Sequence, residues 1–413
     1  MKDLIGFELK KMVQKKIVWI TLLVFLVFQL MQTCMSYFIA SRYVDDKFLE
    51  TKADQYKIER KNAQALSGRK IDDNLLAELA DTYKYKPDSF EKAYSYEYLS
   101  SDDYQNKVRP YEEIDTLVKE IMGKQGDNGY SNVLNITQDE LYKMRKNGVE
   151  MLWDIYKLSD DEIKYWTEKE SKLPEVFTYK YGGMYTEMVD MGGCYFIFMF
   201  MIFFIAICLE GIFTDEHLRK TDQLILCTRY GRKESYIAKI AAGCIVTVCV
   251  TLLYWLVTVL AYLGTYGAGD FSASVQVAYY SFFSETRSIG QVAIILTGIL
   301  FLSSIVLCII TMALSELINN NVGTMAIIMA FSFFIARLIQ IPSDYKFLGK
   351  LWNIVFPINV LKADEGFFDV RLWNIFGIKL TQWQLAPFVY IIVGAIFFFI
   401  GKRKYCKYQV GGR

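Results

Sequence analysis

Histidine is almost absent from this 413-residue chain, in which His217 stands alone. The eight cysteines form no C-x-x-C pair, so the metal sites that histidine and cysteine build are excluded, and we expect no cofactor in the chain. The sequence also lacks the G-x-x-x-x-G-K-[ST] loop that holds ATP phosphates, and the H-E-x-x-H and G-x-S-x-G motifs of hydrolases. We therefore predict no catalytic residue and no ATP hydrolysis by this chain itself.

Charged side chains are missing from six long stretches, each with about the 20 residues that a helix needs to cross a bilayer. These stretches are Ile17–Ser41, Met191–Leu209, Ile240–Gly269, Ser288–Ser315, Leu317–Ala336 and Leu380–Gly401. A large soluble core is the alternative, but soluble helices carry a polar stripe, and these stretches have none. The sequence predicts an all-α polytopic membrane protein with six transmembrane helices.

Basic residues gather at three places that an even number of spans puts on one side of the membrane. They are Lys2, Lys10, Lys11, Lys15 and Lys16; Arg219, Lys220, Arg229, Arg232, Lys233 and Lys239; and Lys402, Arg403, Lys404, Lys407 and Arg413. The positive-inside rule makes that side the cytoplasm, so both termini are expected there, in a plasma membrane. The net charge of +1 gives no reason to expect a nucleic-acid partner.

Residues 42–190 are expected outside the cell as one large, mainly helical domain between the first and second spans. They hold 23 basic and 31 acidic residues, a net of −8, whereas the remaining 23 basic and 14 acidic residues give +9. Thr137 with Glu140, and Ser159 with Glu162, have the spacing of capping boxes that begin helices. The absence of cysteine from this segment excludes disulfides and favours a bacterial surface. Its sixteen tyrosines either fill a helical core, which we favour, or form a face that grips a substrate.

The remaining boundaries follow from these spans. Residues 1–41 form a cytoplasmic flank and the first span, and residues 191–413 hold spans two to six. Within the latter, residues 210–239 form a charged cytoplasmic loop. Residues 342–379 are expected to form two short interfacial or re-entrant helices, broken by Pro357 and Gly366.

The charged loop "FTDEHLRKTDQLILCTRYGRKESYIAKI" (213–240) lies between two uncharged stretches. Thr214, Leu218, Thr221 and Ile225 share one face of a predicted helix, with charges beside them. Such a helix lies on the membrane surface and can press apolar residues into a groove of a soluble partner, with charges at the rim. The alternative is an amphipathic hairpin whose basic residues meet lipid phosphates.

The spacing from Glu216 through Thr221 and Arg232 to Lys239 resembles the first cytoplasmic loop of the ABC type-2 exporter permeases. That loop reads roughly E-x-x-x-G-T-x-x-x-L-L-x-x-P-x-x-R-x-x-x-x-x-x-K. Lys220 and Arg229 depart from it, where the family has glycine and proline. The resemblance implies a coupling helix that docks on a separate ATPase, through Glu216, Leu218, Thr221, Leu224, Ile225, Leu226, Arg232 and Lys239.

The resemblance further implies an ATP-driven exporter. Two ATPase copies would bind a homodimer of this chain or a heterodimer of it with a related permease. The permease dimer would be in contact with membrane lipid. The uncharged, aromatic spans suit an amphipathic peptide, a lipid-like molecule or a drug as cargo. Two alternatives stay open: a non-transporting sensor that signals through the same loop, and a membrane-embedded enzyme, which the few titratable groups in the spans disfavour.

Overall fold

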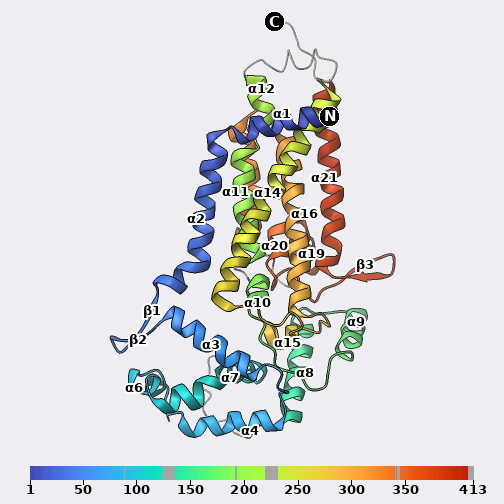
Figure 1. Cartoon of the computed structure of the whole chain (residues 1–413). Helices are drawn as coiled ribbons and strands as arrows, with labels where there is room; N and C mark the ends of the chain where they lie inside the picture. The colour runs from blue at the N-terminus through green and yellow to red at the C-terminus, as the bar shows by residue number, and fades with distance from the viewer. Residues whose placement is uncertain are drawn as a thin grey trace.

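The computed structural model is mainly helical, with 73% of the residues in helices. It describes residues 1–87, 89–123, 135–190, 193–218, 231–339, 341 and 345–407. A bundle of long apolar helices occupies one half of the molecule, and a compact group of shorter helices lies at one end of it (Figure 1). We call that end the outer end, and the opposite end, where residues 1 and 407 lie, the inner end.

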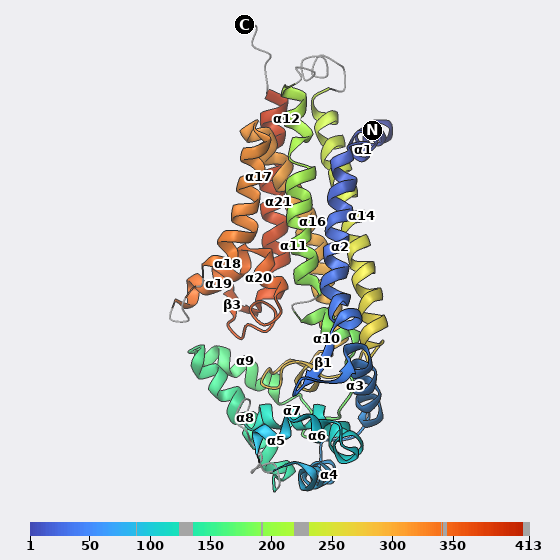
Figure 2. The ribbon, with the colours of Figure 1, turned by 90° about the vertical axis from the view of Figure 1, so that its left-hand side faces the viewer.

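The bundle consists of helices that run side by side in both views (Figures 1 and 2). They are α2 (Lys16–Ile39), α11 (Cys194–Cys208) with α12 (Gly211–Leu218), α14 (Lys233–Tyr266), α16 (Ile289–Ile318), α17 (Asn321–Met329) and α21 (Gln382–Lys407). The apolar cluster of the bundle is continuous, from Met12 near the inner end to Trp166 at the outer end. In α16 the capping box of Ser288 and Gln291 fixes the first turn.

Within the described residues, four helical stretches are long and apolar enough to cross a membrane: Cys194–Glu216, Lys233–Tyr266, Ile289–Ile318 and Gln382–Lys407. A fifth is obtained if α1 (Lys2–Val13) and α2, which meet at a bend of 65°, count as one span. The apolar stretch expected at Leu317–Ala336 forms a shorter helix, Asn321–Ile335, whose last part is π-helical. Of the six predicted spans, the described residues support four, or five if the bent pair counts as one span.

Residues 41–190 begin with a two-stranded antiparallel hairpin, β1 (Ser41–Val44) and β2 (Lys47–Thr51), and continue as helices. The helices are α3 (Lys52–Leu66), α4 (Asp73–Thr82), α5 (Phe90–Ala93), α6 (Tyr96–Leu99), α7 (Glu112–Ile121), α8 (Gln138–Ile155), α9 (Asp160–Glu170) and α10 (Met184–Val189), with 3-10 turns at Tyr83–Tyr85 and Arg109–Tyr111 and a π-helical turn at Tyr104–Val108. Both predicted capping boxes are present, at the starts of α8 and α9.

The outer domain has a core of its own, separate from that of the bundle. Leu75 and Leu79 from α4 pack there with Ile114 and Val118 from α7 and with Leu141 from α8, and all five are fully buried. The aromatic residues that join this core include Tyr83, Phe177 and Tyr179. Burying side chains of this size supplies about 1.5–3 kcal/mol each, which explains how the segment holds its shape without disulfides.

Two irregular connections at the outer end link the bundle helices, and we call them strap A and strap B. Strap A, residues 267–288, joins α14 to α16 and contains the single-turn helix α15 (Val275–Ala278). Strap B, residues 345–381, leads to α21 and contains α19 (Lys346–Val355), α20 (Pro357–Leu361) and a hairpin of β3 (Trp373–Ile375) and β4 (Ile378–Leu380).

The two short helices expected in strap B are found there, and Pro357 stands in the first turn of the second one. Gly366 lies where the chain folds back on α20, since a Cβ there would be 2.3 Å from the Cα of Val360. The β3–β4 hairpin was not predicted. Phe376 occupies its turn with φ of 50°, a conformation that bulky residues rarely adopt.

Glu187 of α10 lies at the junction between the outer domain and the bundle. It lines a cavity of about 310 Å³ together with Arg60, Tyr181 and Tyr266. Burial, with a smaller contribution from the Asp190 carboxylate, raises the pKa of Glu187 to about 7. Because the carboxyl titrates near 4.5 when unfolded, its contribution to stability is complete below pH 4.5 and is lost as the pH rises through 7.

We expect Glu187→Gln to stabilise the protein at pH 8 by roughly 1–3 kcal/mol, because the neutral amide avoids a buried negative charge. At pH 5 the gain should vanish, since the native carboxyl is then protonated. Thermal unfolding of the purified protein at both pH values tests this. Glu168→Gln, on the exposed face of α9, is the control and should change neither transition. An equal effect of Glu187→Gln at both pH values would contradict the assignment.

Candidate functional site

Lys239 is the centre of an ion network at the inner end of the bundle. Its side chain is fully buried in the second turn of α14, and its Nζ lies 3.0 Å from Glu8 Oε1 of α1 and 2.5 Å from Glu216 Oε1 of α12. Lys11, one turn after Glu8, forms a second short ion pair with Glu216. An ammonium group is stable in such a place only when carboxylates surround it. The network therefore ties α1, α12 and α14 together.

A second ion pair lies beside this network. Lys15, in the bend between α1 and α2, is 2.7 Å from Asp215 of α12. The other oxygen of Asp215 accepts a hydrogen bond of 3.0 Å from Asn321, the first residue of α17. Two neighbouring carboxylates of α12 thus hold the N-terminal helix on one side and α17 on the other.

The start of α12 is bonded to the end of α16. The Thr214 and Ser315 hydroxyls are 2.8 Å apart, and the Ser315 hydroxyl also donates to the backbone carbonyl of Glu210. Thr214 and Ser315 are fully buried. The described part of α12 is therefore a continuation of the span that contains α11, packed inside the bundle.

The residues just after the loop are fixed to the end of α21. Arg232 donates a hydrogen bond of 2.9 Å to the backbone carbonyl of Cys406. In the same region, the rings of Phe213, Tyr236 and Tyr405 form a cluster with centroids 5.4–5.7 Å apart. Such aromatic contacts add about 0.5–1.5 kcal/mol each beyond the area they bury. The described residues on both sides of positions 219–230 are thus held by the bundle.

Of the eight predicted coupling residues, the structure describes Glu216, Leu218, Arg232 and Lys239. Glu216 and Lys239 are buried and paired with each other. Arg232 lies at the surface, and Leu218 is the last residue of α12. Thr221, Leu224, Ile225 and Leu226 lie outside the described residues.

Sequence reasoning missed the partners of these residues, above all α1. Glu8 and Met12 are its buried residues, and Phe7 on another face is 66% exposed. Apolar residues at Leu4, Ile5, Leu9 and Met12 repeat at helical spacing, and this pattern could have identified a surface-lying helix. Nothing in the sequence links Glu8 to Lys239, because 231 positions separate them.

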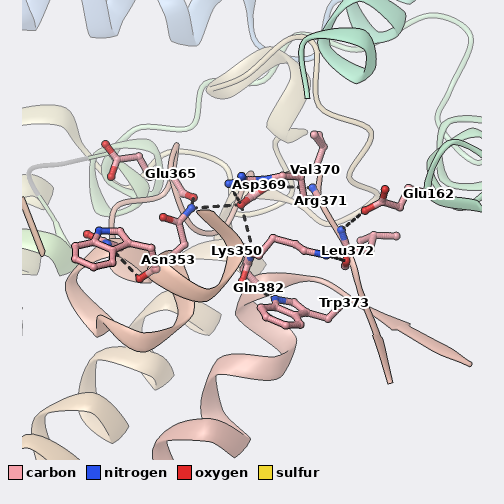
Figure 3. Close-up of polar contacts among 12 residues, drawn as sticks. Glu162, Lys350, Asn353, Glu365, Asp369, Val370, Arg371, Leu372, Trp373 and Gln382 are labelled. Atoms are coloured by element: carbon pink, nitrogen blue, oxygen red, sulfur yellow. Dashed lines mark hydrogen bonds and ion pairs between the residues drawn. The ribbon is translucent and has the colours of Figure 1, made fainter. Parts of the chain in front are cut away.

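The outer domain is attached to strap B by polar contacts from α9 (Figure 3). Glu162 accepts a hydrogen bond of 2.8 Å from the Leu372 N–H, and the Trp166 indole donates one of 2.6 Å to the carbonyl of Val370. Burial alone would raise the pKa of Glu162, but the N–H groups of Ser159 and Leu372 hold it below its ordinary value. Lys379 of β4 adds a bond of 2.5 Å to the carbonyl of Asp161.

Strap B is itself fixed by the buried carboxylate of Asp369. The Arg371 guanidinium donates to both of its oxygens, at 2.9 and 2.7 Å, and Asn353 of α19 and Gln382 of α21 approach it at 3.3 Å (Figure 3). Lys350 donates to the carbonyl of Leu372 at 2.8 Å. Asp369 therefore joins α19 and the later part of strap B to Gln382, the first residue of α21.

Strap A is attached to the outer domain through α8. Arg145 is 3% exposed and donates 2.9 Å to the carbonyl of Ser281 and 2.5 Å to Glu170 of α9. Ser284 donates to the same carboxylate at 2.6 Å. These contacts join α8 and α9 directly to the segments that lead into α16 and α21.

The model of the family described as "ABC-2 family transporter protein" matches residues 4–389 of the chain. The chain belongs to the ABC-2 transporter family. No match was found among curated proteins or among solved structures. Membership makes the chain a membrane component of a transporter, and the match covers the inner-end network, the outer domain and both straps. Among the described residues of this ABC-2 protein, no group of three or more histidine, cysteine, aspartate or glutamate side chains could hold a metal ion.

We expect Lys239→Met to destabilise this ABC-2 protein by about 3–5 kcal/mol, because two buried carboxylates lose their central cation. The double variant Lys239→Met/Glu216→Gln should recover part of the loss, since one of the carboxylates is then neutral. Thermal unfolding of the four proteins of the cycle measures the coupling.

Lys379→Met is the matched control, because its partner Asp161 is exposed, and it should cost about 1 kcal/mol or less. A Lys239→Met protein as stable as the parent would show that the network does not hold the inner end together.

Proposed function

We propose that this chain is the permease subunit of an ATP-driven ABC exporter and couples to a separate ATPase through the loop at 219–230. Family membership supports the transporter role. The observation that carries the coupling proposal is the anchoring of both loop ends: Glu216 to α1 and α14, and Arg232 to α21. A partner that pushes on this loop would act on several spans at once.

The proposed complex contains two ATPase copies, and a homodimer of this chain or a heterodimer with a related permease, in a bacterial plasma membrane. The sequence holds no phosphate-binding loop, so the nucleotide site is assigned to the ATPase. Export of an amphipathic peptide, a lipid-like molecule or a drug is the proposed activity. Of the predicted docking residues, Leu224, Ile225 and Leu226 supply the apolar contacts, and Leu218 and Thr221 flank them.

Glu216, Arg232 and Lys239 have a different part in this proposal. Their contacts within the chain make them positioning residues, which hold the loop against the bundle. Substituting them is expected to affect the stability of the inner end as well as ATPase attachment.

The coupling proposal predicts that Leu224→Glu abolishes co-purification of the ATPase and transport, with normal membrane insertion. A carboxylate in an apolar groove costs several kcal/mol, enough to lower the affinity at least about a hundredfold. Pull-down of the ATPase from cells that express both subunits measures the loss. Leu224→Met is the control and should retain the ATPase. Full ATPase retention by Leu224→Glu would refute docking at this position and favour a lipid-facing hairpin.

The proposed orientation places the outer domain outside the cell. A cysteine introduced at Ser159, at the exposed start of α9, should react with a membrane-impermeant maleimide added to intact cells. The control is a cysteine at Lys2, which should react only after the membrane is permeabilised. The native cysteines within the described residues lie outside the outer domain and are tested in the parent chain as background. Labelling of Ser159→Cys only after permeabilisation would show that the topology is the reverse of the proposed one.

A membrane sensor is the second candidate, and the bonds from α8 and α9 to both straps favour it, because they link the outer domain to two spans. A sensor would bind its ligand without moving it. Transport into sealed vesicles that contain this chain and the ATPase distinguishes the two functions.

A further inference from the structure

The β3–β4 hairpin of strap B projects sideways from the outer end of α21 (Figure 1). In antiparallel strands, residues directly opposite each other lie on the same face, and successive residues alternate between the two faces. The pairs of this hairpin are Trp373 with Leu380, Asn374 with Lys379, and Ile375 with Ile378. One face of the hairpin is therefore entirely apolar, and the other is polar.

The polar face is turned toward the outer domain. Lys379 donates its bond of 2.5 Å to the carbonyl of Asp161 in α9, and α9 lies next to the hairpin on its outer side in both views (Figures 1 and 2). Asn374 accepts a bond of 3.0 Å from the N–H of Gly377 and so closes the turn. Because the two faces are opposite, the apolar one points away from α9, toward the level of the bundle.

The tip of the hairpin is apolar and exposed. Phe376 is fully exposed, and Ile378 beside it is 64% exposed. The positive φ of Phe376 suits glycine or asparagine better than a bulky ring. Neither the backbone of the turn nor burial within the chain therefore accounts for a phenylalanine at this place. A surface outside the chain does account for it.

The length of α21 places the hairpin at the edge of the bilayer. The uncharged stretch Leu380–Gly401 is followed directly by the basic residues of the inner end, which begin at Lys402. At a rise of 1.5 Å per residue, the hydrocarbon core of about 30 Å takes up about 20 residues. The outer boundary of that core then falls close to Gln382, the residue with which α21 begins just after β4.

The apolar face of the hairpin is continuous with the apolar surface of the span. Trp373 packs edge-on against Phe347 of α19, with ring centroids 5.9 Å apart, and its indole donates 2.9 Å to Gln382 (Figure 3). Leu380 lines a mainly apolar groove of about 530 Å³ between α16 and α21. Exposed apolar side chains continue along α19 and α21, at Phe347, Leu348 and Leu351, and at Phe388, Ile391 and Ile392.

We propose that the β3–β4 hairpin is a membrane anchor, which inserts Phe376 and Ile378 among the acyl chains at the outer edge of the bilayer. Trp373 then lies at the level of the lipid headgroups, a place that indole rings favour. Because strap B is bonded to α9, the anchor also holds the outer domain close to the lipid surface. The inference depends on neither transport nor an ATPase.

The contact is tested with the photoreactive residue p-benzoyl-phenylalanine, placed at Phe376 or at Ile378 of the full chain in phosphatidylcholine nanodiscs without an ATPase. Ultraviolet light joins this side chain to C–H groups that it touches, and the mass of the intact chain identifies what was joined. We expect the mass of one lipid to be added at both positions. Tyr94, an exposed aromatic residue of the outer domain, is the matched control and should give at least about fivefold less lipid adduct.

Phe376→Asp should lower the lipid adduct formed at Ile378 at least about fivefold, because a carboxylate is expelled from the edge of the hydrocarbon. Phe376→Trp should retain the adduct. Phe376→Asn suits the turn better than phenylalanine, so it should lower the adduct with the hairpin intact, and it decides the question if the aspartate variant does not fold.

Three results would each overturn the proposal: adducts with a second copy of the chain in place of lipid, equal lipid adducts at Tyr94, or an unchanged adduct in Phe376→Asn. Because no ATPase is present, such a result leaves the permease assignment untouched, and loss of ATPase association leaves the lipid adducts untouched.

Discussion

The buried ammonium of Lys239 is the constraint on which the inner end depends. It lies in a long helix whose other charged residues, Lys233 and Glu234, are confined to the first turn. Burial of its charge is tolerated only because Glu8 and Glu216 approach within 3.0 Å. This requirement places α1 across the end of the bundle and keeps α12 in line with the span before it. The positions of α12 and α14 in turn determine where the residues on both sides of the charged loop lie. The same three side chains therefore determine the packing of the inner end.

Buried ion pairs also hold the outer end together. Asp369 and Arg371 form a buried pair, and Arg145 with Glu170 forms another, and each also bonds a backbone or amide group of a second element. The first pair holds strap B to α21, and the second holds strap A to α8 and α9. These satisfied pairs thus form the frame of the outer end.

Local signals in the sequence predicted local structure well. The capping boxes of Thr137 and Ser159 are present because their two residues are three positions apart and need no tertiary partner. The apolar stretches predicted the long helices for a similar reason, since hydrophobicity alone determines them. The β3–β4 hairpin escaped prediction because Phe376 replaces the Asn or Asp that usually marks such a turn. The burial of Glu216 and Lys239 could not be predicted, because it depends on Glu8, which is distant from Lys239 in the sequence.

The separation between Glu8 and Lys239 has a consequence for biogenesis. A ribosome makes α1 first and reaches Lys239 only 231 residues later, after the whole outer domain has been synthesised. Until then Glu8 has no ammonium from α14 to bind, and α1 can only wait on the membrane surface. The inner end is consequently among the last parts of the molecule to close. A chain released before α14 is inserted would lack the ammonium group that Glu8 and Glu216 share in the complete molecule.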